Sequence, residues 1–175
     1  MSSSNLIPTI PAEEHARRMR RASSSLAGIW DLLDAVKDPE IPALSLWEMG
    51  ILQDLEMDGD RVVVTITPTY SGCPAMSVMA EDLVAALEKA GYRSEVVSRL
   101  SPAWSTSWMS DEAKEKLRTS GIAPPVINVG SESGVSCPCC GSDEIKKLSE
   151  FGTTACKALY QCIACGEPFD HFKPI

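Results

Sequence analysis

Two pairs of cysteines near the carboxyl end constrain the fold of this chain more than any other feature. Cys137 and Cys140 form one Cys-x-x-Cys pair, Cys162 and Cys165 form another, and 21 residues lie between Cys140 and Cys162. Two residues between thiols let one tight turn direct both sulfur atoms at one ion, so the pairs predict a tetrahedral four-thiolate Zn²⁺ site. A disulfide framework also uses four cysteines and is the alternative.

The residues around the pairs refine this prediction. Gly141 and Gly166 follow the two pairs, where the backbone often needs a positive φ. Cys139 lies inside the first pair and adds a thiol that could exchange with a ligand. Cys156 either replaces one of the paired cysteines or packs in the small domain, and packing is favoured. His171 is a weaker ligand candidate, since four better-spaced thiolates exist. A domain as small as this ribbon is expected to need the metal in order to fold.

Length and composition predict a protein with one ordinary domain and one small one. The chain has 175 residues, of which 44% are hydrophobic. No run of eighteen apolar residues is present, so no transmembrane helix is expected. Residues 1–8 lack a basic segment followed by an apolar stretch, so no secretory signal is expected. Seven cysteines without such a signal indicate a reducing, cytoplasmic location.

Charge and residue types exclude several classes of function. The net charge is −8, and the acidic excess lies in the middle of the chain, which disfavours nucleic-acid binding and favours protein partners. The sequence has only two histidines, no Glu-x-x-His pair for a di-iron centre and no glycine-rich dinucleotide fingerprint. The chain is therefore not expected to be an enzyme by itself.

Hydrophobic periodicity and turn residues predict an α/β (α+β) fold: a small three-stranded sheet with helices, followed by a small zinc ribbon. Met57-Asp58-Gly59-Asp60 between two strand-like runs is a strong hairpin signal. The predicted helices are 26–36, 75–90 and 110–120, the last with Ser110 as its expected N-cap residue. The predicted strands are 51–56, 61–67 and 92–100.

Composition changes divide the chain into four segments. Residues 1–25, rich in serine and arginine, are expected to form a mobile, solvated tail with a short helix near Glu13–Arg21. Residues 26–122 form the α/β domain. Residues 123–135, with adjacent prolines and several glycines, form a linker, and residues 136–175 form the ribbon.

Cys73 is the second candidate site, because it is the only cysteine of the first domain. It precedes Pro74 at the expected start of a helix, which makes it the expected N-cap residue. The helix dipole would then stabilise its thiolate, and Gly72 would leave room for a ligand. The alternative is a small buried apolar residue. Asp38 and Glu40 flank Pro39 and could lie near this loop, although the sequence alone does not establish that proximity.

Ordered motifs across residues 26–120 resemble the SufT-like iron–sulfur assembly domain. They are Asp38-Pro39-Glu40-Ile41-Pro42, Met49-Gly50-Ile51, Thr65 to Pro74, Pro102-Ala103-Trp104 and Met109 to Ala113. This resemblance implies a small α/β protein associated with cluster assembly or delivery, whose distinctive cysteine corresponds to Cys73. It adds Asp38, Glu40 and Thr69 as candidates for handling iron or a cluster.

The ribbon resembles a narrower family. Ser149 to Tyr160 and Glu167 to Lys173 look like the zinc ribbon of the PaaD (PaaJ) family, which belongs to phenylacetyl-CoA epoxidase systems. That resemblance implies an accessory role in aerobic phenylacetate degradation, beside a di-iron oxygenase subunit and an iron–sulfur flavin reductase subunit. A basic residue is common in the family where this chain has Cys139.

The sequence favours one function, maturation, and leaves a second open as its alternative. In the first, the chain is a maturation factor that holds iron or a cluster transiently on Cys73. One thiolate is a poor ligand set for a cluster, so transfer would need a homodimer, a ligand from a partner or small thiols. In the second, the chain is a structural docking subunit of the oxygenase complex. A thiol-redox role and a nucleic-acid ribbon are less favoured.

Overall fold

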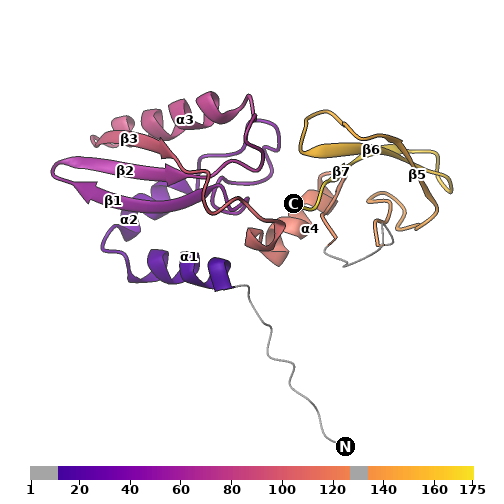
Figure 1. The fold of residues 1–175 in the computed structure, drawn as a ribbon, viewed down its shortest axis with the longest axis horizontal. Helices are drawn as coiled ribbons and strands as arrows, with labels where there is room; N and C mark the ends of the chain where they lie inside the picture. The colour runs from indigo at the N-terminus through magenta and orange to yellow at the C-terminus, as the bar shows by residue number, and fades with distance from the viewer. Residues whose placement is uncertain (1–11, 127–133) are drawn as a thin grey trace, which may run out of the picture.

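The computed structural model describes residues 12–126 and 134–175, which form an α/β part and a β-sheet part that lie against each other (Figure 1). We call residues 12–121 the first domain and the described residues from 122 onward the ribbon. Residues 1–11 of the predicted tail and 127–133 of the predicted linker lie outside the described residues.

The first domain contains a mixed three-stranded sheet, as predicted. Its strands are β1 (Leu52–Asp58), β2 (Arg61–Ile66) and β3 (Arg93–Ser98), in the order β1-β2-β3. The first two strands are antiparallel, and Asp58 pairs with Arg61, so the hairpin turn is as tight as its Asp-Gly signal predicts. The last two strands run parallel, with a helix connecting them.

Helices enclose the main core beside this sheet. They are α2 (Ala27–Leu33), α3 (Met76–Lys89), the short η1 (Thr106–Trp108) and α4 (Asp111–Thr119). The predicted capping of α4 is confirmed, because the Ser110 hydroxyl accepts a hydrogen bond of 3.1 Å from the Ala113 amide. The largest fully buried side chains of this domain include Trp30, Leu33, Leu44, Leu46, Met49, Ile51, Leu52, Ile66, Met79, Leu83 and Leu87.

Helix α1 (Ala12–Ser23) corrects the prediction of a solvated tail over these residues. Arg17 is only 3% exposed, and its guanidinium donates to the carbonyls of Trp47 (2.9 Å), Leu52 (3.2 Å) and Trp108 (3.0 Å). It also lies 3.9 Å from the centroid of the Trp47 ring. The sequence misled because a run of arginines is usually solvated, whereas this one satisfies buried carbonyls of the chain itself.

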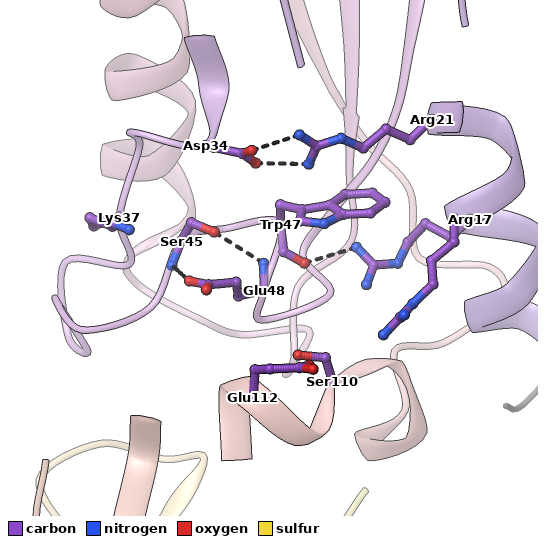
Figure 2. A pocket seen from close by; sticks show the side chains of 10 residues that line it. Arg17, Arg21, Asp34, Lys37, Ser45, Trp47, Glu48, Ser110 and Glu112 are labelled. Atoms are coloured by element: carbon purple, nitrogen blue, oxygen red, sulfur yellow. Dashed lines mark hydrogen bonds and ion pairs between the residues drawn. The ribbon is translucent and has the colours of Figure 1, made fainter. Parts of the chain in front are cut away.

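A second arginine ties α1 to the segment after α2. Arg21 donates to both carboxylate oxygens of Asp34, at 2.8 and 2.6 Å (Figure 2). Beside them, Ser45 and Glu48 exchange side-chain and backbone hydrogen bonds of 2.8 and 3.2 Å. These residues border a cavity of about 530 Å³. The arginines that border this cavity already have partners within the fold, so we interpret the region as the surface against which α1 packs.

The ribbon forms a four-stranded sheet in the order β4-β7-β6-β5. The strands are β4 (Ile122–Ala123), β5 (Ile145–Ser149), β6 (Lys157–Cys162) and β7 (Pro168–Phe172). Strand β4 pairs in parallel with β7, Ile122 against Asp170 and Ala123 against His171. The sheet of the ribbon therefore begins before the segment that was predicted to be the linker.

The ribbon is docked firmly on the first domain. Phe172 is fully buried in the core of the first domain, with its ring centroid 5.9 Å from that of Trp104. The amide of Ile175 donates to the Thr106 hydroxyl at 2.7 Å, and the Thr106 amide donates to the Ile175 carbonyl at 3.0 Å. The position of the ribbon is thus fixed by both apolar packing and backbone hydrogen bonds.

His171 predicts a dependence of stability on pH. It is 5% exposed, and its Nε2 atom is buried without a hydrogen-bond partner. Burial, with a smaller contribution from the charge of Lys147, lowers its pKa from 6.5 to about 4. The unfolded chain binds this proton near pH 6.5. The free energy of unfolding is therefore unaffected by His171 above pH 6.5. It falls as the pH drops towards 4, by at most about 1.4 kcal/mol per pH unit.

The His171→Phe variant tests this expectation. It keeps a ring against Tyr160, whose centroid lies 5.5 Å from that of His171, but it cannot bind a proton. The unfolding free energy of the variant should rise relative to wild type between pH 7 and pH 5. Since metal loss in acid affects both proteins, their difference isolates the histidine. A difference that is constant with pH would contradict the assignment.

Candidate functional site

The four paired cysteines converge as predicted. Their sulfur atoms all lie within 4.8 Å of one another, with Cys137 Sγ 3.8 Å from Cys165 Sγ and Cys140 Sγ 3.5 Å from Cys162 Sγ. A tetrahedron with Zn–S bonds of about 2.3 Å has edges of about 3.8 Å, so this donor set fits a zinc ion. None of the four is in a disulfide, which excludes the disulfide alternative for this structure.

Backbone geometry presents these sulfur atoms. Gly141 and Gly166 have φ values of 77° and 79°, which confirms the predicted role of the two glycines. The Gly141 and Gly166 amides donate to the carbonyls of Cys137 (2.8 Å) and Cys162 (3.0 Å), closing each turn. The Cys165 amide, first among several donors, lowers the pKa of Cys162 to about 7. The turn at Cys162 therefore favours the thiolate that a metal needs, whereas the pKa values of Cys140 and Cys165 are raised, in part by hydrogen bonds with neighbouring thiols.

The remaining residues of the ribbon do not join this donor set. Cys139 is exposed, and His171 is buried against Tyr160. Cys156 is half-buried, with its sulfur 3.1 Å from the Thr154 hydroxyl. It packs against the core of the first domain, so the expectation that it packs is correct, although the core concerned belongs to the other domain.

The structure places Cys73 differently from the prediction. Helix α3 begins at Met76 with Ala75 as the N-cap residue, so Cys73 precedes the cap and lies in a loop. Its amide donates to the Tyr70 carbonyl at 3.0 Å. The ring of Tyr70 also occupies the space beside Gly72, since a Cβ atom there would lie 2.9 Å from that ring. The room expected at Gly72 is therefore already filled.

The expected stabilisation of the Cys73 thiolate is wrong. Burial raises the pKa of the Cys73 thiol, the Ala75 amide offsets this in part, and the charges of Glu40 and Asp38 raise it further. Burial likewise raises the pKa of Cys156. Both thiols are consequently protonated at neutral pH, and a cation that binds them must displace protons.

The carboxylates flanking Pro39 lie beside this loop and play different parts. Asp38 is 4% exposed, and its Oδ1 atom accepts from the amides of Glu40 (2.8 Å) and Ile41 (2.9 Å), so it shapes the turn. Burial raises its pKa. The half-buried Glu40 lines a cavity with Cys73, and burial followed by the charge of Asp38 raises its pKa.

Three loops, two from the first domain and one from the ribbon, surround this cavity of about 150 Å³. Glu40 follows α2, Thr69 and Cys73 follow β2, and Cys156 precedes β6 of the ribbon. Thr69 is buried there. The structure thus brings together Cys73, Glu40 and Thr69 as candidate site residues, while Asp38 acts through the turn. The sequence did not assign Cys156 to this site, because nothing local places it opposite Cys73.

A larger apolar cavity of about 590 Å³ shares Thr69, Tyr70, Ala155 and Cys156 with the small one. Its border includes exposed apolar residues: Tyr70, Leu100, Phe151 and Ile175. The two cavities adjoin at these four residues: the small one is lined by the thiols of Cys73 and Cys156, and the large one is bordered by apolar side chains.

Family models match both parts of the chain. Residues 26–98 match the iron-sulfur cluster assembly protein family, and residues 122–173 match the PaaD zinc beta ribbon domain. The first domain is therefore similar to an iron–sulfur cluster assembly family, and the four converging cysteines lie within the matched zinc ribbon domain. The second match begins at Ile122, where β4 begins.

Two curated relatives match different shares of the chain. The chain is 44% identical over 151 residues to a protein of Escherichia coli (strain K12) that is provisionally named as a subunit of 1,2-phenylacetyl-CoA epoxidase, covering 84% of this chain and 92% of the relative. This chain belongs to the PaaD family. It is also 32% identical over 89 residues, 49% of its length and 84% of the relative, to an Fe-S protein maturation auxiliary factor of Porphyromonas gingivalis.

Among solved structures, a domain of unknown function DUF59 from Bacillus anthracis is 26% identical, with a TM-score of 0.49, covering 59% of this chain and 95% of that one. Within the described residues, no helix has both the length and the apolar character needed to cross a membrane.

Proposed function

We propose that this protein is an accessory maturation factor of a phenylacetyl-CoA epoxidase system, which helps to supply iron or an iron–sulfur cluster to the oxygenase or the reductase subunit. The observation that carries the proposal is the position of Cys73, half-buried beside the Glu40 carboxylate in a cavity between the domains. A soft thiol and a hard carboxylate together suit transient binding of iron better than acid–base catalysis. The names of the two relatives support the same role.

In this proposal the chain is not the catalyst. The iron or cluster is a cargo that partners receive, and the zinc ribbon holds a wall of the cavity and contacts the partner. The protonated state of the Cys73 thiol fits a transient carrier, because cargo must compete with a proton and is released more readily than from a set of thiolates.

The variant Cys73→Ala tests the proposal in cells that produce the complete epoxidase system. We expect the fold to persist, because Cys73 is only half-buried, while the iron and sulfide content of the purified oxygenase and reductase subunits falls several-fold. Cys139→Ala, which changes an exposed thiol outside the cavity, is the matched control. Equal metal content with both variants would reject the maturation role.

The second candidate is a non-catalytic docking subunit. The exposed apolar border of the wide cavity, with Phe151 66% and Leu100 60% exposed, favours it. The same experiment separates the two functions. A docking subunit predicts that Cys73→Ala leaves both the metal content and the epoxidase activity unchanged, whereas Phe151→Ser together with Leu100→Ser lowers copurification with the other subunits.

A further inference from the structure

The small cavity of about 150 Å³ between the domains is lined by two thiols rather than one. Cys73 reaches it from the loop after β2, and Cys156 reaches it from the loop before β6. Neither is in a disulfide, and both are half-buried against the core of the first domain. A single cysteine is a poor ligand set, whereas two cysteines from different loops that line one cavity can hold an ion together.

The loop of Cys156 is held in place by the ribbon. The Cys156 carbonyl accepts from the Lys173 amide at 2.9 Å. Thr153 donates from its amide (3.2 Å) and its hydroxyl (2.6 Å) to the Asp170 carboxylate. With Phe172 buried in the other domain, these contacts fix Cys156 relative to Cys73. The zinc ribbon therefore acts here as a rigid support for a second thiol.

The charges around the two thiols favour a cation. Asp38 and Glu40 both raise the pKa values of Cys73 and Cys156, which places two carboxylates close to both thiols. Lys157 is the basic group that acts on Cys156, and its Nζ atom lies 3.8 Å from the Asp170 carboxylate, which offsets its charge. A cavity lined by two soft donors and one carboxylate, that of Glu40, matches a thiophilic divalent ion.

We propose that Cys73 and Cys156, with Glu40 as a third ligand, form a second metal site that binds a thiophilic divalent cation at the junction of the two domains. The inference deepens the proposed function, on which it rests for the statement that the ion is iron in the cell. Ligand atoms of these three residues are not among those within 4.8 Å of one another, so binding includes a side-chain rotation into the cavity of about 150 Å³.

The proposal is tested with Co²⁺ as the probe, added without oxygen to the full chain already loaded with zinc. Zinc binds more tightly than cobalt, so the ribbon site stays filled and any thiolate-to-cobalt absorption reports a different site. We expect one further equivalent of Co²⁺ in the wild type. Cys73→Ser and Cys156→Ser should each weaken it at least ten-fold, while Cys139→Ser should leave it unchanged.

Binding should release protons, because both thiols are protonated at neutral pH. The affinity for Co²⁺ should therefore fall steeply from pH 8 to pH 6, and Glu40→Gln should weaken binding without removing the thiolate absorption. No thiolate absorption in the zinc-loaded wild type, or full absorption in Cys156→Ser, would overturn the proposal. Each variant should still contain one zinc ion per chain, which excludes unfolding of the ribbon as the cause of weaker Co²⁺ binding.

The two proposals fail separately. If Cys73→Ala starves the epoxidase subunits of iron but Cys156→Ser supports normal iron content and normal Co²⁺ binding, maturation stands and the two-thiol site is rejected. If Co²⁺ binding requires both cysteines while neither variant changes the iron content of the epoxidase subunits, the site stands and the maturation role is rejected.

Discussion

Cys137→Ser is expected to release the zinc and unfold the ribbon. The side chain is 2% exposed and supplies one of four converging sulfur atoms. Zinc binding contributes about 10–16 kcal/mol to the folding of comparable small zinc domains, more than the ribbon's apolar residues can replace. The expected result is less than one zinc per chain and the loss of dispersed amide resonances for residues 134–175.

This loss should reach the first domain as well. Phe172 is fully exposed to water once the ribbon unfolds, and the removal of a buried phenylalanine from a core costs about 3–5 kcal/mol. We therefore expect a lower midpoint of thermal unfolding for the first domain of Cys137→Ser. Cys139→Ser, which changes an exposed thiol two residues away, should retain zinc and stability. A folded, metal-free ribbon after chelation of the wild type would refute this account.

Arg17→Met is expected to lower the free energy of unfolding by roughly 3–5 kcal/mol, since each buried acceptor left without a donor costs about 1–3 kcal/mol. The substitution removes the donors that Arg17 gives to the carbonyls of Trp47, Leu52 and Trp108, of which the Trp47 carbonyl keeps the Gly50 amide at 3.0 Å. Burial lowers the pKa of Arg17 to about 10, so the guanidinium is still charged at pH 7 and its donors are all available.

Urea denaturation of zinc-saturated protein at pH 7 measures this effect. Arg20→Met is the matched control on the same helix, because Arg20 is 44% exposed and its ion-pair partner Asp54 is 21% exposed and keeps a hydrogen bond from the Leu55 amide at 2.9 Å, so the pair contributes below about 1 kcal/mol. Arg17→Lys should restore little, since one ammonium group cannot reach three separate carbonyls. Equal losses for Arg17→Met and Arg20→Met would mean that the buried hydrogen bonds of Arg17 do not stabilise the fold.

Features that depend on neighbouring residues could be predicted from the sequence. The Asp-Gly hairpin, the Ser110 cap and the left-handed Gly141 and Gly166 each follow from local backbone chemistry. The convergence of the paired cysteines follows from the spacing of metal ligands.

Features that depend on contacts between distant segments could not be predicted. Arg17 lies in a charged run, and only the fold brings three carbonyls to it. The thiol of Cys73 was assigned to a helix cap because Pro74 follows it, but the helix begins later and the carboxylates nearby come from another loop. Cys156 has no local signal at all, since its place opposite Cys73 depends on how the domains dock.

Strand β4 has a consequence for how this protein can be divided. Only two residues long, it covers part of the edge of β7 and follows directly from the first domain. A fragment that starts at residue 136 would leave that edge open, with backbone groups ready to pair with another copy. Such a fragment should self-associate, while one starting before Ile122 keeps its own edge strand. The short strand thus protects the ribbon from aggregation, and a truncation that removes β4 would leave the edge of β7 unpaired.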